Sequence, residues 1–344
     1  MPPLTSDNAD LLKALLRDVS RSFYLTLRIL PQPVRRQISL AYLLARTTDT
    51  IADTTLVPVA DRLDALGALR QRILNPAAPT PDFDRFAQAQ GDAQATTAER
   101  VLLQRVHEAF RILESFSEED QFLIRKVLLI ITSGQELDLQ RFAQATISNP
   151  VALSDLEALD DYTYRVAGCV GEFWTEMCQS HLYSEANLDP ATLMENAVRF
   201  GKGLQWVNIL RDLPRDLLQG RCYLPADRLK AHGIEPRELL DLKTWTRLRP
   251  LYYELLESAE AHLAAGWIYT CTLPRWPARV RLACGLPLLI GARTLERLRG
   301  ANPLDPTWRV KASRNEVQTM FRQLLFRYPF RRSWEKLFDE WRPG

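Results

Sequence analysis

Two segments of the sequence carry aspartates four residues apart, the interval that places side chains on one face of a helix. In the first segment, YLLARTTDTIAD, the pair is Asp49 and Asp53, and Arg46 lies one turn earlier on the same face. Two carboxylates this close repel each other unless a cation lies between them. Mg²⁺ suits such a pair, because it prefers oxygen ligands and is typically held by one or two carboxylates together with substrate phosphates.

The second segment, NILRDLPRDLLQGRCYLP, extends the pattern to three residues: Asn208, Asp212 and Asp216 recur at every fourth position. Pro214 falls inside this run, where a helix loses one hydrogen bond and meets a steric clash that together cost about 3 kcal/mol. We expect the helix to continue nonetheless, to bend or tighten near Leu210–Pro214, and to keep Asp216 turned toward the interior.

The two groups together predict a site for a diphosphate. If they faced each other across a helical bundle, they would hold the diphosphate through bridging Mg²⁺, and Arg21 and Arg46 would donate charge-assisted hydrogen bonds to its oxygens. An isolated pair of this kind can also lie on a solvated helix face. The pattern alone leaves both readings open.

The elements that carry these residues read as helices. Apolar residues recur at three- and four-residue spacing along most of the 344 residues, there is no run of alternating strands, and Gly totals only 14. We therefore predict one all-α domain over residues 1–344. It would contain a flexible Pro-, Ala- and Gln-rich connection at about 75–97 and a basic, aromatic C-terminal segment at about 320–344.

Composition excludes several classes of protein. A net charge of +2 gives no field that would attract nucleic acid, so no nucleic-acid partner is expected. The five cysteines form no CxxC pair, which argues against structural zinc and a disulfide framework. No signal pattern opens the sequence, and the longest apolar runs, such as 282–292, are about half the length that spans a bilayer. The expected location is the cytoplasm, with at most a peripheral membrane contact.

The C-terminal segment admits two readings. Residues 306–344 carry nine Lys and Arg against four Asp and Glu. Five aromatic residues stand there near helical spacing: Phe326, Phe330, Trp334, Phe338 and Trp341. Such a stretch can lie on an anionic bilayer or pack on its own bundle, and packing is the reading we favour.

Four motifs in order, SRSFYLTL, YLLARTTDTIAD, DDYTYRVAGCVGEFW and GLQWVNILRDLPRDLLQGRCYLP, resemble the squalene/phytoene synthase family. The resemblance spans about residues 20–225 and continues more weakly to about 320. It implies a single-domain isoprenoid synthase helical bundle with a central cavity. It also implies a Mg²⁺-dependent prenyltransferase that joins two prenyl diphosphates head to head. The sequence most resembles squalene synthases, which condense two farnesyl diphosphates to presqualene diphosphate and reduce it to squalene with NADPH.

The resemblance also assigns roles to individual residues. Metal ligands would be Asp49, Asp53, Asn208, Asp212 and Asp216. Residues that meet the substrate would be Ser20, Arg21, Ser22, Phe23, Gln205 and Asn208. Catalytic residues would be Arg46, Arg211, Tyr42, Tyr162 and Tyr269, with Tyr162 in the first half-reaction. One departure is Ala52, which stands where animal squalene synthases carry an acidic residue; Pro214 is another.

The reductant and the product are less constrained. No G-x-G-x-x-G follows a strand, so a Rossmann-type nicotinamide site is excluded. Lys311 and Arg314 stand near the basic residues that meet the nucleotide phosphates in squalene synthases. The alternatives are a phytoene- or dehydrosqualene-type synthase without a reductant, a hydroxysqualene-forming enzyme, and a non-catalytic assembly factor. The last would be expected to lose its aspartates, which are intact here.

Overall fold

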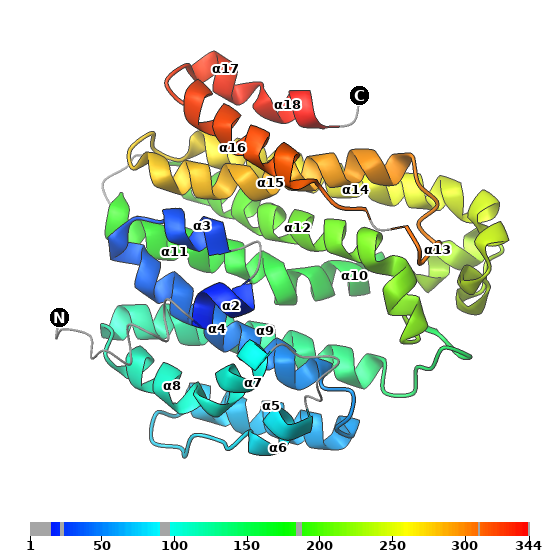
Figure 1. Ribbon diagram of the computed structural model, residues 1–344, viewed down its shortest axis with the longest axis horizontal. Helices are drawn as coiled ribbons and strands as arrows, with labels where there is room; N and C mark the ends of the chain where they lie inside the picture. The colour runs from blue at the N-terminus through cyan, green and yellow to red at the C-terminus, as the bar shows by residue number, and fades with distance from the viewer. Residues whose placement is uncertain (1–14, 21–23, 90–96, 184–187, 309, 343–344) are drawn as a thin grey trace. The chain divides into compact units, whose positions relative to one another are not determined.

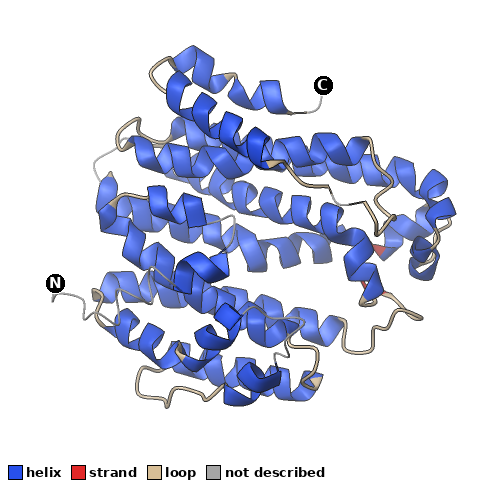
Figure 2. Ribbon diagram, viewed as in Figure 1, coloured by secondary structure: helices blue, strands red, loops and turns tan. Residues whose placement is uncertain are grey.

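The computed structural model describes residues 15–20, 24–89, 97–183, 188–308 and 310–342. Helices make up most of this part of the chain, as Figure 2 shows. Its strands are β1 (Val151–Leu153) and β2 (Arg221–Pro225), which pair in parallel. The prediction of an all-α fold is confirmed, with the short strand pair as an addition.

The chain divides into two compact units, and the prediction of one domain stays a prediction. Unit 1 contains residues 1–140 and 173–185, and unit 2 contains residues 141–172 and 186–344. The helices of unit 1 are α2 (Leu16–Ser20), α3 (Tyr24–Ile29), α4 (Gln32–Asp53), α5 (Val59–Leu74), α6 (Asp84–Ala89), α7 (Thr97–Gln104), α8 (Val106–Glu114) and most of α9 (Glu118–Arg141) and α11 (Cys169–Leu182).

Helix α4 is the core element of unit 1 and packs against α5, α7 and α8. Its apolar side chains Leu40, Leu43 and Ile51 are fully buried. Removing such side chains from water contributes about 1.5–3 kcal/mol each. This burial explains why α4 stays helical up to Asp53, although threonines and aspartates fill its last two turns.

The predicted connection at 75–97 contains a helix that the composition did not reveal. Helix α6 lies inside it, and the rings of Phe83 and Phe86 are buried with their centroids 6.1 Å apart. Burial of two aromatic side chains three residues apart outweighs the weak helical propensity of the Pro-, Ala- and Gln-rich surroundings.

Unit 2 is arranged around α12. Its elements are β1, α10 (Leu156–Thr163), the π-helical turn η3 (Tyr164–Gly168), α12 (Pro190–Leu218), β2, α13 (Ala226–Ala231), the 3₁₀ turns η4 (Pro236–Leu240) and η5 (Leu242–Thr244), α14 (Trp245–Thr272), α15 (Ala278–Arg299), α16 (Arg314–Arg327), α17 (Arg331–Glu335) and α18 (Leu337–Trp341). Helix α12 contacts α10, η3, β2, α14 and α15. Figure 1 shows it running between α14 and α10.

Two glycines allow η3 and the start of α11 to lie directly on α12. A Cβ at Gly171 would come 1.9 Å from the carbonyl oxygen of Ala197, and one at Gly201 would come 2.1 Å from that of Ala167. Any side chain at either position would force the backbones apart. This contact fixes the VAG part of the third motif against the helix that carries Asn208 and Asp212.

Helix α12 passes through Pro214 without changing its α-helical pattern. The proline removes the N–H that would bond the carbonyl of Leu210. The hydroxyl of Tyr252, on α14, donates to that carbonyl at 2.9 Å, and the Tyr252 side chain is fully buried. The predicted tightening of the helix is therefore not observed, and the predicted bend stays a prediction. The Asp216 side chain, which was expected to turn toward the interior, is partly buried.

The C-terminal segment folds back on unit 2. The rings of Trp334 and Phe338 stack on Trp267 at centroid distances of 5.6 and 5.9 Å, and the Trp267 indole donates to the Glu335 carbonyl at 2.9 Å. The favoured reading of packing is confirmed for this part. Among the described residues, no helix has the length and apolar content needed to cross a bilayer.

The phenol of Tyr252 gives the first prediction. Replacing Tyr252 by Phe leaves the Leu210 carbonyl buried without its donor, which should lower the free energy of unfolding by about 1–2 kcal/mol. In a Pro214→Ala background the helix regains its own N–H, so Tyr252→Phe should cost about 1 kcal/mol less. Urea unfolding of the four proteins measures this coupling.

The neighbouring tyrosine supplies the control. Tyr253 also donates to a carbonyl, that of Arg299 at 2.8 Å, but it has no proline partner. Tyr253→Phe should therefore cost the same in both backgrounds. Equal costs of Tyr252→Phe in both backgrounds would contradict the assigned role of Tyr252.

Candidate active site

The first aspartate group lies in the last turns of α4, and neighbouring side chains hold it. The Arg46 guanidinium lies 3.7 Å from the Asp49 carboxylate and also pairs with Glu99 of α7. The Gln135 amide, on α9, donates to the other Asp49 oxygen at 2.6 Å. Asp53, the last residue of α4, is exposed. The structure thus joins Arg46 and Asp49 and adds two partners, Glu99 and Gln135.

The surroundings of Asp49 disfavour its negative charge. Burial raises the pKa of Asp49 to about 7, with Arg46 opposing the shift and the charges of Asp53 and Glu99 adding to it. The C-terminal end of a helix is also the negative end of its dipole, and the last turn of α4 contains no basic residue. The Asp49 side chain nevertheless keeps 36% of its surface accessible. A cation that reached it would therefore relieve an existing repulsion.

The second group lies along α12 in unit 2. The Arg211 guanidinium donates to both oxygens of Asp212, at 2.8 and 2.5 Å, and this pairing raises the pKa of Arg211. The Asn208 amide donates to the Gln205 side chain at 3.3 Å. Asp216 is partly buried one turn beyond Asp212. The predicted residues of this group are all on α12, with Arg211 serving as the counter-ion of Asp212.

These donors fit Mg²⁺ that binds together with a substrate. Among the described residues, no three or more His, Cys, Asp or Glu side chains form a group able to hold a metal ion alone. Each aspartate group offers two carboxylates, and the second adds the Asn208 amide oxygen. Hard oxygen donors of this number match Mg²⁺, which keeps several waters and completes its shell with phosphate oxygens. They do not match zinc or another metal that needs a full protein cage.

Two aromatic groups lie in unit 2. The ring of Tyr162, on α10, is buried and stacks on Tyr223 of β2, with centroids 4.8 Å apart and planes 25° apart. Tyr269 is buried on α14, with its centroid 6.1 Å from that of Phe200. In unit 1, Tyr42 is partly buried on α4.

The Ser-Arg-Ser-Phe segment is only partly described. The Ser20 side chain is buried, and its hydroxyl donates to the Leu16 carbonyl one turn earlier in α2. This bond satisfies the hydroxyl within its own helix. The other three predicted substrate contacts, Arg21, Ser22 and Phe23, lie outside the described residues.

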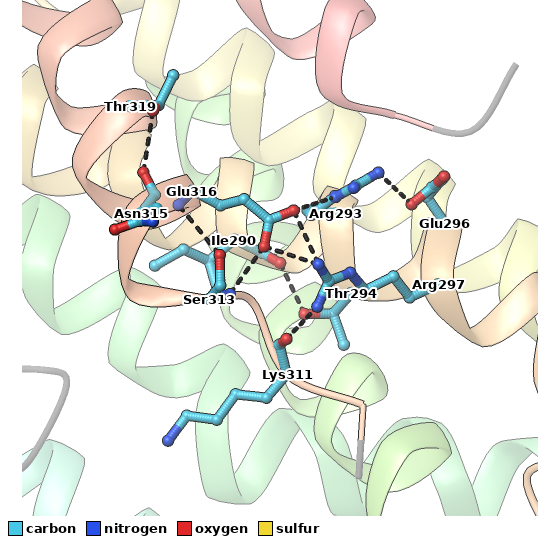
Figure 3. A network of polar contacts seen from close by, with 10 residues as sticks. All are labelled: Ile290, Arg293, Thr294, Glu296, Arg297, Lys311, Ser313, Asn315, Glu316 and Thr319. Carbon is cyan, nitrogen blue, oxygen red and sulfur yellow. Dashed lines mark hydrogen bonds and ion pairs between the residues drawn. The ribbon is translucent and has the colours of Figure 1, made fainter. Parts of the chain in front are cut away.

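The residues predicted to meet NADPH lie near a network around Glu316, shown in Figure 3. The Glu316 carboxylate accepts hydrogen bonds from the Ser313 N–H at 2.8 Å, Arg293 at 2.8 Å and Arg297 at 2.7 Å. Arg297 also donates to the Lys311 carbonyl, while the Lys311 side chain extends away from the network. Lys311 and Arg314 are both exposed. The network fixes the backbone of this segment and leaves both side chains to solvent.

Sequence reasoning missed three neighbours of the site: Glu99, Gln135 and Tyr223. No local pattern singled them out. Gln135 is one of several polar residues in its stretch of α9, LLIITSGQELDLQ, and all three depend on contacts with residues far away in the sequence.

The network of Figure 3 gives a pH-dependent prediction. Desolvation alone would raise the pKa of Glu316, but hydrogen bonds from Ser313 and the charges of Arg293 and Arg297 outweigh it and lower the pKa to about 2. A lowered pKa in the folded state stabilises the protein above the unfolded value of about 4.5, and this stabilisation is lost as pH falls from about 4.5 to 2.

Glu316→Gln should therefore lower the free energy of unfolding by about 2 kcal/mol near neutral pH, and the difference from wild type should shrink as pH falls below about 4.5. Glu296→Gln is the matched control. Glu296 pairs with the same Arg293 but has a more exposed side chain, so its loss should cost less than about 1 kcal/mol. Urea unfolding over this pH range measures both, and a pH-independent cost of Glu316→Gln would contradict the assignment.

Comparison with known proteins identifies the family of this chain. The family model described as squalene/phytoene synthase matches residues 16–316. A presqualene diphosphate synthase of Zymomonas mobilis subsp. mobilis is 28% identical over 247 residues, which cover 72% of this chain and 70% of that protein. A bifunctional lycopene cyclase/phytoene synthase of Blakeslea trispora is 28% identical over 287 residues, covering 81% of this chain but only 43% of that protein.

Among solved structures, that of TcSQS with a ligand aligns over 98% of this chain and 97% of its own, with a TM-score of 0.76 and 19% identity. This likeness shows the fold. Because the family model covers most of the sequence, including both aspartate groups, the chain belongs to the squalene/phytoene synthase family.

Proposed function

We propose that this protein joins two farnesyl diphosphates head to head to form presqualene diphosphate and then reduces that product to squalene with NADPH. Its family consists of prenyltransferases that process prenyl diphosphates. The observation that supports Mg²⁺ dependence most directly is the placement of Asp49 one turn before Asp53 at the C-terminal end of a helix, where burial disfavours the Asp49 charge and raises its pKa.

In the first step, the carboxylates of the aspartate groups would hold Mg²⁺ where the substrate diphosphate binds. The bound ion would neutralise the diphosphate so that the allylic C–O bond can ionise. Arg211 holds both oxygens of Asp212 and so orients this ligand before the substrate arrives. Arg46, shared between Asp49 and Glu99, has the same role in unit 1 and keeps the positive charge near the diphosphate.

The second step joins the two chains through a carbocation, which water would destroy. The double bond of the second farnesyl chain attacks the cation, and loss of one proton closes the cyclopropane ring of presqualene diphosphate. Buried aromatic rings stabilise a cation without attacking it, by about 0.5–2 kcal/mol each. Tyr162 suits this step, because its ring is buried against Tyr223 and its hydroxyl can accept the proton and pass it to the released diphosphate.

Two basic residues support the reduction by NADPH. Lys311 and Arg314 are exposed basic residues, which suits binding of the nucleotide phosphates of NADPH. The alternative is a synthase without a reductant that makes phytoene, dehydrosqualene or hydroxysqualene. We retain this alternative because the similar proteins include a presqualene diphosphate synthase and a bifunctional lycopene cyclase/phytoene synthase. A non-catalytic assembly factor is disfavoured because both aspartate groups are intact.

An assay with purified protein, farnesyl diphosphate and Mg²⁺ tests the product assignment. We expect presqualene diphosphate without NADPH and squalene only when NADPH is added, because hydride must quench the final cation. Liquid chromatography with mass spectrometry detects presqualene diphosphate, and gas chromatography with mass spectrometry separates the hydrocarbon products. Dehydrosqualene regardless of NADPH, or phytoene from a C20 substrate, would replace the proposal with the alternative, and no turnover of either substrate would favour the assembly factor.

Substitution of the aspartates tests the metal assignment. Asp49→Asn and Asp212→Asn should each lower Mg²⁺-dependent turnover at least about a hundredfold. The unfolding temperature of Asp49→Asn should stay the same or rise, because the substitution removes a disfavoured charge. Asp64→Asn, at an exposed position of α5, is the control and should leave turnover unchanged. Near-normal turnover of either active-site variant would contradict the assignment.

A further inference from the structure

The two aspartate groups hold their arginines in different ways. In α12 the Arg211 guanidinium closes on Asp212 and donates to both of its oxygens, at 2.8 and 2.5 Å. In α4 the Arg46 guanidinium stays 3.7 Å from the Asp49 carboxylate, beyond the roughly 2.7–2.9 Å of a charge-assisted hydrogen bond. We call Arg211 with Asp212 the closed pair and Arg46 with Asp49 the open pair.

Neither exposure nor spacing explains why one pair is open. The Asp49 and Asp212 side chains are 36% and 38% accessible, so solvent reaches both to a similar degree. Asp339 and Arg342 are three residues apart, as Arg46 and Asp49 are, yet their charged atoms approach to 3.2 Å. The cause therefore lies in the neighbours of the open pair.

Glu99 competes with Asp49 for the Arg46 guanidinium. It stands in the first turn of α7, its side chain is only 7% accessible, and it accepts a hydrogen bond from Arg46. A carboxylate is stabilised at this end of a helix. A buried pair of a guanidinium and a carboxylate is costly to break, because each partner would be left charged and unpaired. Glu99 therefore holds Arg46 away from Asp49.

Gln135 fixes one oxygen of the Asp49 carboxylate. Its amide donates to Oδ1 at 2.6 Å, while Arg46 approaches Oδ2. Gln135 lies in line with Ile131 and Leu139, which are buried one turn before and one turn after it in α9, so packing fixes its position. An amide is a neutral donor, which orients the carboxylate without cancelling the charge that a metal ion needs.

We propose that Glu99 and Gln135 are positioning residues that keep Asp49 ready to bind Mg²⁺. Glu99 holds Arg46 back, and Gln135 fixes Oδ1 so that Oδ2 is available to the cation. The inference rests on the proposed role of Asp49 in binding Mg²⁺ with a diphosphate, and it adds two residues that lie outside the four motifs.

Loss of Glu99 should convert the open pair into a closed one. Arg46 would then close on Asp49, as Arg211 closes on Asp212, and a guanidinium there has to give up an oxygen before a metal ion can bind. Neighbours that orient a metal ligand typically change metal affinity about 10–100-fold when they are replaced.

Binding of inorganic pyrophosphate over a range of Mg²⁺ concentrations tests the proposal without turnover. Isothermal titration calorimetry of the full chain gives the Mg²⁺ concentration at which pyrophosphate binding is half-maximal. Glu99→Gln should raise this concentration about tenfold and Gln135→Met about fivefold. Turnover at saturating Mg²⁺ should stay within about twofold of wild type, because neither side chain is assigned to the substrate.

An Arg46→Gln background separates the restraint on Arg46 from the charge of Glu99. If Glu99 acts by holding Arg46 back, Glu99→Gln should change the half-maximal Mg²⁺ concentration by less than about twofold in that background. Gln135→Met does not act through Arg46 and should keep its effect of about fivefold. An equal effect of Glu99→Gln in both backgrounds would show that Glu99 acts through its charge alone and would overturn its assigned role.

Two similar pairs elsewhere in unit 1 supply the controls. Gln37 donates to the buried Asp120 at 3.0 Å, and Glu114 pairs with the buried Arg72. Gln37→Met and Glu114→Gln should lower the unfolding temperature as the two test variants do, but they should leave the Mg²⁺ dependence of pyrophosphate binding unchanged. The proposal is overturned if the control variants shift that dependence as much as the test variants. It is also overturned if the wild type does not bind pyrophosphate in the presence of Mg²⁺.

Because binding is measured without farnesyl diphosphate, its outcome is separate from the enzymatic assay. A protein that makes no squalene but shows the expected shifts in Mg²⁺ dependence would overturn the proposed function alone. A protein that makes squalene while its variants match the wild type in Mg²⁺ dependence would overturn this inference alone. Gln135→Met removes no charge, so it carries the test by itself if Glu99→Gln does not fold.

Discussion

The hydrogen bond from Tyr252 to the Leu210 carbonyl is the interaction on which unit 2 depends most. Without it, Pro214 would leave the buried Leu210 carbonyl unpaired in the C-terminal part of α12. With it, α12 remains helical to Leu218 and leads into β2. The same helix therefore keeps Asp212 before the proline and Asp216 after it on one continuous element. The packing of α14 on α12 thus also keeps Asp212 and Asp216 on one helix.

In unit 1 the comparable constraint is electrostatic. The apolar face of α4 fixes the helix, and its last turn then holds two carboxylates at the unfavourable end of the dipole. Arg46 and Gln135 offset part of this cost, yet the pKa of Asp49 stays raised. Burial of the apolar face of α4 stabilises the helix and offsets the unfavourable charge at the end that carries Asp49. This division suits a cation site, because repulsion between the ligands is relieved only when the cation binds.

The sequence predicted what depends on local periodicity and failed where distant residues compete. Helical spacing of apolar residues was enough to predict the all-α fold, and the four-residue interval was enough to place Asp49 with Asp53 on one helix and Asp212 with Asp216 on another. The partner of Asp49, Gln135, is 86 residues away, and the donor to Leu210 is 42 residues away. No local pattern specifies such pairs. Helix α6 was missed for a related reason, because burial of Phe83 and Phe86 overrode the composition around them.

Two prolines show how far this limit reaches. Pro214 and Pro329 both interrupt helical patterns, and the sequence gives no reason to treat them differently. At Pro214 a hydroxyl from α14 supplies the missing hydrogen bond, and the helix continues. At Pro329 a guanidinium from the turn after α14 instead binds the carbonyls of residues 328 and 329, and α16 ends at Arg327. Because α16 ends there, the aromatic residues of the C-terminal segment do not share one helix face. Trp334 is buried in the core, while Phe330 remains at the surface. In both places the side chain that contacts the backbone near the proline comes from a distant segment, which the local sequence does not specify. In this chain α12 continues, so Asp212 and Asp216 stay on one helix, whereas α16 ends and the Phe330 side chain remains exposed.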